Sequence, residues 1–258
     1  MVILAIGDIC ADSGIAIVKD KLPLLRKLYD VDLAIANGEN SAAGGVGITV
    51  SSIQSIMSSG VDIVTTGNHS FTNQGYENLY ENTYGLLRPY NLGKGVPGKG
   101  YMLYDKGRYQ VLVVNMLGIQ YMNTASTNFY DAMDEILEKE NADVVVVDFH
   151  AEYTSEKIAF ARNYDGMISL VFGTHTHVQT ADETIFPNGT AFISDLGMTG
   201  VKESVIGVDI KKAIDRQRYA VPIRLAPAKG PSMISGILVE IDEKTKQAKA
   251  IERLCVEE

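Results

Sequence analysis

The four histidines of this chain are the residues best suited to metal chemistry. They are His69, His150 and the pair His175 and His177, and each lies just past an apolar run that predicts a buried strand. Imidazole is the commonest protein ligand for first-row transition metals, and two histidines separated by one residue in an irregular loop can reach two different ions. The four histidines therefore indicate a metal site.

Oxygen ligands follow the apolar runs in the same way. The residues in question are Asp8, Glu39, Asn40 and Asn68. In an open α/β sheet, residues just beyond the carboxyl ends of the strands converge on one crevice. We therefore expect five separate loops to contribute to one polar site.

The loop residues suggest different chemical roles. Glu39 can bridge two cations, with Asn40 or Asn37 as a neutral oxygen donor. Asn68 and His69 are adjacent, so their side chains should point in different directions. We assign Asn68 to metal binding and His69 to proton transfer.

Taken one at a time, several of these motifs have plainer interpretations. An aspartate after a strand, such as Asp8, is more often a turn or helix-capping residue. A lone histidine such as His150 is more often structural, and residues 37–40 are rich in turn-forming types. The glycines of residues 44–47 lack the lysine of a P-loop and are interpreted as backbone of the site wall. The occurrence of all the motifs together favours the metal site.

Composition limits the classes of partner. The chain has 258 residues, 46% of them hydrophobic, and a formal net charge of −9. This charge argues against binding of extended nucleic acid, whose affinity comes mostly from neutralised phosphates. The apolar N-terminal run is too short for a signal peptide or a membrane span, and Cys10 and Cys255 form no disulfide framework. We expect a cytoplasmic protein without membrane association.

The elements that must position the site alternate between strand and helix. Strands are expected at residues 2–6, 33–36, 61–66, 101–104, 109–115, 144–148, 167–172 and 190–194, and helices at 13–28, 50–59, 72–82, 126–140 and 154–163. This order favours a parallel or mixed sheet covered on both faces. A hairpin is expected from residue 236 to Leu254 around the polar turn 242–246. The chain is thus expected to be a layered α/β sandwich in one domain, residues 1–258.

The order of these motifs resembles that of the calcineurin-like metallophosphoesterases, and within them the bacterial YmdB-type phosphodiesterases. The likeness spans nearly the whole chain. It is carried by Ile6-Gly7-Asp8-Ile9, Ala36-Asn37-Gly38-Glu39-Asn40, Thr66-Gly67-Asn68-His69, Leu87-Arg88-Pro89, residues 149–157, residues 173–182, Gly197-Met198-Thr199-Gly200 and Ser204-Val205-Ile206-Gly207.

The resemblance implies an α/β/β/α sandwich with mixed sheets and a binuclear metal centre. Glu39 would be the bridging carboxylate, His69 the catalytic residue, and the cofactors two divalent or trivalent transition metal ions, iron or else manganese. The implied ligands are Asp8, Glu39, Asn40, Asn68, His150, His175 and His177. The chain departs from the wider superfamily at two positions, since Cys10 stands where a histidine is usual and Glu39 replaces an aspartate. Cys10 is interpreted as either a buried small residue or a contact to the metal site.

The implied function is hydrolysis of small phosphodiesters, with 2′,3′-cyclic nucleotides such as 2′,3′-cAMP as substrates. A hydroxide bridging the two ions would attack phosphorus, and His69 as general acid would protonate the leaving oxygen. Two alternatives stay open: a phosphomonoesterase or 5′-nucleotidase, and a regulatory RNA-associated module that retains the site. A Rossmann-type cofactor binder is excluded because its glycine fingerprint is absent.

The tyrosines near residue 80 bear on the oligomeric state. Tyr76, Tyr80 and Tyr84 recur at a spacing of four residues. This spacing fits the packed face of a helix, and it also fits the interface of a homo-oligomer. Packing is the favoured interpretation.

Overall fold

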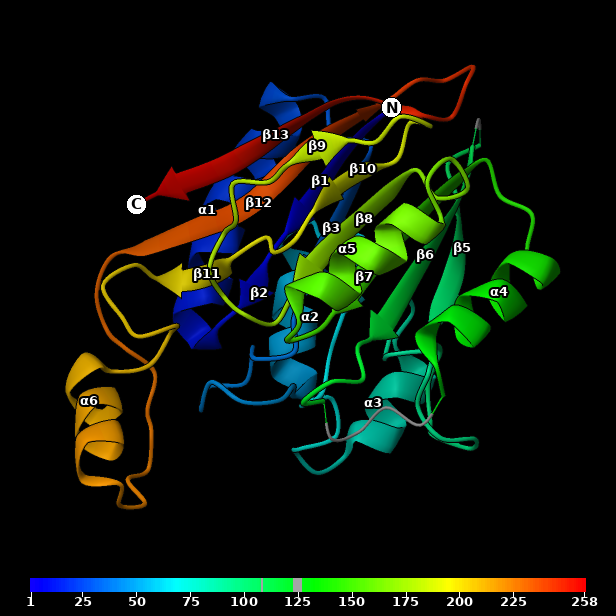
Figure 1. Cartoon of the computed structure of the whole chain (residues 1–258). Coiled ribbons are helices and arrows are strands. Elements are labelled where there is room, and N and C mark those ends of the chain that lie inside the picture. Colours follow the sequence, from blue (N-terminus) through cyan, green and yellow to red (C-terminus); the bar gives the residue numbers. More distant parts are fainter. Residues whose placement is uncertain (108, 123–126) are drawn as a thin grey trace.

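Two β-sheets lie face to face in the computed structural model, which describes residues 1–107, 109–122 and 127–258 (Figure 1). The first sheet consists of β1 (Val2–Ile6), β2 (Asp8–Ile9), β3 (Leu33–Asn37), β4 (Ile63–Thr65), β11 (Met198–Val201), β12 (Ser232–Ile241) and β13 (Ala248–Glu257). The second consists of β5 (Tyr101–Asp105), β6 (Gln110–Leu117), β7 (Val144–His150), β8 (Leu170–Thr174), β9 (Thr184–Ile185) and β10 (Ala191–Ile193).

Most of the helices cover the outer faces of these sheets. The helices are α1 (Ala11–Leu28), α2 (Val50–Ser58), α3 (Tyr76–Asn82), α4 (Phe129–Lys139), α5 (Thr154–Asn163) and α6 (Ile210–Tyr219). Helices α1 and α2 pack on the first sheet, and α4 and α5 on the second, whereas α6 projects from the sandwich (Figure 1). In the described residues, no helix has the combined length and apolarity that crossing a bilayer requires.

Both sheets are mixed. In the first, β1, β3 and β4 run parallel, and β12 pairs antiparallel with β1 on one side and β13 on the other. In the second, β6, β7, β8 and β10 run parallel, with β5 and β9 antiparallel at the edges. Parallel strands place their carboxyl ends at one edge of a sheet, so loops far apart in the sequence are brought together there.

Alternation along the strands builds three apolar layers. In β1, Ile3 and Ala5 belong to the cluster between the two sheets, whereas Leu4 and Ile6 belong to the cluster with α1 and α2. Residues 111–114 of β6 alternate in the same way between the inner cluster and the cluster with α4 and α5. A strand buried on both faces reads as a continuous apolar run, which is how these segments were predicted. The expected α/β/β/α order of layers and the mixed sheets are confirmed.

Several boundaries differ from those expected. The third helix begins at Tyr76 rather than at residue 72, after Gly75 with a φ of 84°. The fourth was expected from residue 126, which lies outside the described residues; it begins at Phe129, where the side chain of Asn128 accepts the N–H of Tyr130. The short strands β2, β9 and β11 and the polar helix α6 were not predicted, since two to four residues carry no periodic signal and α6 has little apolar content.

The tyrosines near residue 80 separate into two environments. The rings of Tyr76 and Tyr80 both contact Phe71, and Tyr80 is buried. Tyr84 lies beyond the end of α3 and is 73% exposed. The packed helix face therefore accounts for the first two.

Candidate functional site

The carboxyl ends of strands from both sheets meet at one edge of the sandwich, where all eight expected site residues lie in one network of contacts. Asp8 follows β1, Glu39 and Asn40 follow β3, Asn68 and His69 follow β4, His150 ends β7, and His175 and His177 follow β8. A cavity of about 410 Å³ opens beside them. Glu39, Asn40, His69, His175 and His177 are among its lining residues.

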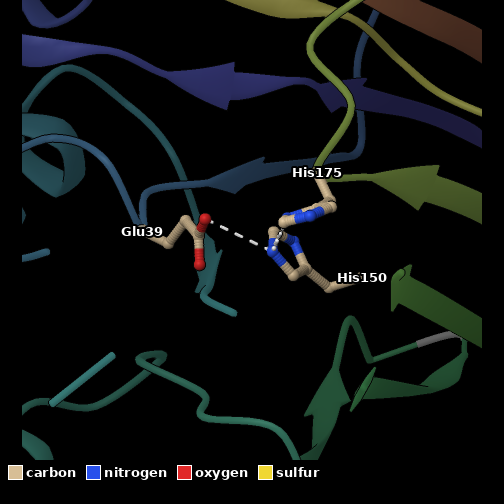
Figure 2. Close-up of side chains that lie close together, drawn as sticks. All are labelled: Glu39, His150 and His175. Atoms are coloured by element: carbon tan, nitrogen blue, oxygen red, sulfur yellow. Dashed lines mark hydrogen bonds and ion pairs between the residues drawn. The ribbon is translucent and has the colours of Figure 1, made fainter. Parts of the chain in front are cut away.

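Three side chains converge on one ring nitrogen of His150, and together with it they form what we call the inner donor set: Glu39, Asn68, His150 and His175. The Nε2 atom of His150 lies 3.3 Å from Oε1 of Glu39, 3.0 Å from Oδ1 of Asn68 and 3.1 Å from Nδ1 of His175. Figure 2 shows Glu39 facing the two adjacent imidazoles. The ligand atoms of Glu39, His150 and His175 all lie within 4.8 Å of one another, a spacing that suits coordination of one cation.

A second group adjoins the first and is called the outer donor set: Asp8, Asn40 and His177. The Nε2 atom of His177 lies 3.7 Å from Oδ1 of Asp8 and 3.2 Å from the amide of Asn40. The same amide lies 3.1 Å from Oε1 of Glu39, which joins the two sets. The carboxylate of Glu39 thus contacts side chains of both groups.

One carboxylate oxygen of Asp8 lacks a hydrogen-bond partner among the described residues. This atom, Oδ1, is buried. Burial raises the pKa of this carboxyl to about 6, against the lowering effect of His177 and His150. A buried polar atom without a partner is costly, and a cation is the partner that a carboxylate oxygen most favours. The residues of the site therefore fit a bound metal ion.

Glycine at position 67 keeps the inner donor set open. A Cβ atom there would collide with the carboxylate of Glu39 and the imidazole of His150. The motif that precedes Asn68 thus needs glycine for close approach of backbone to ligand atoms.

The loop after β8 adopts a strained backbone. His175 has a φ of 99° and His177 a φ of 65°, and residues other than glycine rarely adopt such positive values. The N–H of His175 donates to Oδ2 of Asp8 over 3.2 Å, and the N–H of Thr176 donates to Oδ2 of Asp195 over 3.0 Å. These bonds hold the turn that directs both imidazoles to the site. They offset the unfavourable backbone conformation, which costs about 1–3 kcal/mol for each strained residue.

Behind the inner donor set lies a buried hydrogen-bond network centred on Asp148. The Nδ1 atom of His150 is 2.8 Å from Oγ1 of Thr174, which donates to Oδ1 of Asp148 over 2.6 Å. Asn37 donates to Oδ2 of Asp148 over 3.0 Å, and Thr65 donates to the same oxygen. Such a network fixes the orientation of the imidazole, so that its other nitrogen points at the donor set.

This network was not predicted from the sequence, although the spacing of Asp148 and His150 could have indicated it. Asp148 lies two residues before His150 on the same strand and therefore on the same face. The network also shows which of two asparagines is free to act as an oxygen donor. The amide nitrogen of Asn37 donates to Asp148, and its Oδ1 accepts the N–H of Glu39 over 3.1 Å. Asn40 is left as the asparagine that faces both donor sets.

A second buried support anchors the loop that carries the histidine pair. Lys157 of α5 donates to Oδ2 of Asp195 over 3.0 Å and to the carbonyl of Thr174 over 2.9 Å. Both charged side chains are almost fully buried. This pair was not predicted either, because residues 157 and 195 meet only through the packing of α5 against β8 and β10.

Cys10 contacts the outer donor set and also lines the cavity. Its Sγ lies 3.8 Å from Nδ1 of His177, and the carbonyl of Ile206 lies 3.1 Å from the same nitrogen. Burial raises the pKa of the Cys10 thiol, so the sulfur is neutral at physiological pH. The thiol therefore lies against the ring nitrogen remote from Asp8, as a buried small side chain.

The charges of the site are strongly coupled. Burial alone would raise the pKa of Glu39, but the charge and hydrogen bond of His150 outweigh it and lower that pKa to about 2. Burial opposes protonation of His177 as well, yet the contacts with Cys10 and Asp8 raise its pKa to about 10. For His175, burial and the neighbouring His150 lower the pKa to about 3. Without metal, the site thus holds a proton on His177 and an ionised carboxylate on Glu39.

Known proteins are similar to this chain over nearly its whole length. The family described as YmdB-like protein matches residues 4–254. A Bacillus subtilis (strain 168) protein named 2′,3′-cyclic-nucleotide 2′-phosphodiesterase is 38% identical over 257 residues, which cover 99% of this chain and 97% of that protein.

Two crystal structures resemble the fold closely. A hypothetical protein from Thermus thermophilus has a TM-score of 0.94 and 37% identity, with 100% of both chains covered. A structure described as a novel phosphatase from Mycoplasma pneumoniae has a TM-score of 0.93 and 31% identity over 100% of this chain and 93% of that one. The shared region includes every element that carries the site.

Proposed function

The chain belongs to the YmdB-like family, and on this premise we propose that it is a metal-dependent phosphodiesterase acting on small phosphodiesters, in particular 2′,3′-cyclic nucleotides such as 2′,3′-cAMP. Its named relatives are phosphodiesterases or phosphatases, so phosphate ester hydrolysis is the activity common to the group. The finer assignment to cyclic nucleotides rests on the name of the Bacillus subtilis relative, which covers the chain almost completely.

The observation that carries the proposal is the convergence of two donor sets on Glu39. Its Oε1 lies 3.3 Å from His150 in the inner set and 3.1 Å from Asn40 in the outer set. We assign the inner ion to Glu39, Asn68, His150 and His175, and the outer ion to Asp8, Glu39, Asn40 and His177. Two ions of iron or manganese suit this mixture of imidazole and oxygen donors.

When bound, two such ions would neutralise charge on the phosphoryl oxygens and make hydroxide available at neutral pH. The residues of the chain then have separate tasks. Gly67 leaves room for the ligands, and the network of Asp148 orients the imidazole of His150.

His69 is the proposed general acid. Its backbone N–H donates to Oε2 of Glu39 over 3.2 Å, which fixes the loop, and the residue lines the cavity. An imidazolium in this wall could protonate the departing sugar oxygen, a contribution of about 10²–10⁴-fold in rate. Replacing His69 with alanine should therefore lower turnover while the metal content stays near two ions per chain; equal losses of both would refute this role.

The cavity suits a substrate of nucleotide size. A volume of about 410 Å³ lies within the range of small-molecule sites. Its lining combines polar members of the donor sets, such as Glu39 and His177, with apolar residues, among them Val46, Val208 and Leu225. A phosphate could bind at the polar residues and a nucleoside could contact the apolar ones.

The decisive experiment is hydrolysis of 2′,3′-cAMP by the purified protein with manganese. Glu39→Gln tests the bridging carboxylate, and Glu252→Gln on exposed β13 is the control that changes the net charge equally. We expect turnover by the wild type and the control, and none by the Glu39 variant or with excess chelator. Turnover that persists with chelator would overturn the proposal.

A further inference from the structure

The charged residues around the cavity are unusual for a phosphate site. Among the described residues that line it, none is lysine or arginine. Its ionisable side chains besides Cys10 are three histidines, Glu39 of the donor sets, and Glu152. Phosphate sites commonly use arginine or lysine to balance the charge of the phosphate. Here the cations bound by the donor sets would be the main positive charge facing a substrate.

Glu152 has no place among the proposed ligands, yet it touches one of them. Its Oε2 lies 3.1 Å from Nε2 of His175, while Nδ1 of the same ring faces His150 at 3.1 Å. A carboxylate on one ring nitrogen fixes the proton there and leaves the lone pair of the other nitrogen for a metal ion. Glu152 is thus built to orient His175.

The second consequence of this position is electrostatic. The side chain of Glu152 is 50% exposed, so its carboxylate lies at the wall of the cavity rather than behind the site. A phosphodiester carries one negative charge, whereas a phosphomonoester carries nearly two at neutral pH. A carboxylate in the lining of the cavity would repel the second charge of a monoester bound at the donor sets, and the described lining offers no lysine or arginine to offset that repulsion.

We propose that Glu152 is a positioning and specificity-determining residue, which orients His175 and disfavours dianionic monoesters relative to monoanionic diesters. This inference rests on the proposed phosphodiesterase function and names the charge of its substrate class. A phosphomonoesterase could use the same metal ions, so the ions alone do not select the substrate. The charge of Glu152 in the cavity lining would favour diesters over monoesters.

The test compares wild type with Glu152→Gln, which keeps an oxygen near His175 and removes the charge, and with Glu252→Gln as the remote control. The substrates are bis-p-nitrophenyl phosphate and p-nitrophenyl phosphate, which share a leaving group and differ by one charge. At about pH 8 we expect kcat/KM for the monoester to rise about tenfold relative to the diester in Glu152→Gln, equivalent to ~1.4 kcal/mol. The control should keep the wild-type ratio.

Two readouts are independent of turnover. The metal content of each variant is measured directly, and binding of inorganic phosphate and dimethyl phosphate to the manganese-loaded proteins is measured by calorimetry. We expect Glu152→Gln to bind phosphate about tenfold more tightly and dimethyl phosphate unchanged, with two ions per chain. An unchanged ratio of the two affinities, or equal loss of both substrates with loss of metal, would overturn the selectivity.

Failure of the proposed function would look different. A wild type that hydrolyses neither ester refutes the phosphodiesterase, whereas the calorimetric comparison still decides whether Glu152 repels a dianion. Hydrolysis of the diester with an unchanged monoester ratio in Glu152→Gln refutes the selectivity assigned to Glu152 and leaves the phosphodiesterase in place.

Discussion

His150 of the inner donor set and His177 of the outer set are held by different means. In the inner set, Nδ1 of His150 is bonded to Thr174 and through it to the buried carboxylate of Asp148. In the outer set, Nδ1 of His177 faces the neutral thiol of Cys10 and the carbonyl of Ile206, a residue that is 52% exposed in a loop. The first histidine ends a central strand, and the second follows a turn of positive φ.

This difference shows which contacts hold each imidazole in place. Strand pairing and buried hydrogen bonds preorganise His150 of the inner set before any ion binds. His175 of the inner set and His177 of the outer set share the strained loop after β8, and Nδ1 of His177 contacts a thiol and a loop carbonyl. We therefore expect the two ions to bind in sequence, the inner one more tightly.

The largest effect is expected from Gly67→Ala. The added methyl group would displace Glu39 and His150 together, and a misplacement of about 1 Å can cost about 100-fold in rate. Turnover should fall at least that far, with loss of the inner ion seen in the metal content. Nearly normal metal content and rate would mean that the inner set adapts readily, which would weaken the comparison.

A smaller effect is expected from Asp148→Asn. Removing the charge that Thr174 contacts should weaken binding of the inner ion by about 10–100-fold and leave the outer ion nearly unaffected. Competition with a chelating dye measures both affinities. Thr65→Ser keeps the hydroxyl that donates to Asp148 and serves as the matched control. Equal weakening of both ions would show that the two sets are not independent.

The outer ion should bind more tightly as the pH rises. The pKa of His177 is raised to about 10 without metal, so at neutral pH this ring must lose a proton before it can bind an ion. In the inner set the two histidines differ. The pKa of His175 is lowered to about 3, whereas for His150 burial alone would lower the pKa, but the charge and hydrogen bond of Glu39 outweigh it and raise that pKa. Affinity of the outer ion should therefore rise up to tenfold per pH unit between about pH 7 and 9, because His177 has to lose its extra proton.

Calorimetry in two buffers of different ionisation enthalpy checks the sign of this effect. Binding of the outer ion should release about one proton at neutral pH, and the number should fall toward zero as the pH approaches 10. Proton uptake on binding, or a pH-independent affinity, would contradict the charge assigned to His177.

The smallest effect is expected from Cys10→Ala. A neutral thiol 3.8 Å from His177 contributes packing and a weak contact, so the outer ion should bind only a few-fold more weakly. The inner ion should be unaffected, and Cys10→Ser is the matched polar variant. Complete loss of the outer ion in the alanine variant would identify the sulfur as a ligand instead.

Much of the fold followed from local patterns. Buried strands such as β1, β3 and β7 read as continuous apolar runs, and the polar residues at their ends marked the site. The elements that were missed are those whose signal is not local. β2 has two residues and pairs with β11, which lies about 190 positions later in the chain; no periodicity within either segment indicates that pairing.

The sequence by itself determined which residue types stand at the ends of strands, because apolar periodicity and the chemistry of histidine, aspartate, glutamate and asparagine are local properties. It could not determine which of Asn37 and Asn40 faces the two donor sets, or that Asp148 supports His150 and Glu152 contacts His175. The tertiary structure decided these points, since each depends on the angle and distance between side chains from different strands and loops. Asp8 and His177 are 169 positions apart and meet only after both sheets have formed and packed. Contacts of that kind arise from sheet register and loop geometry, and short-range sequence patterns encode neither.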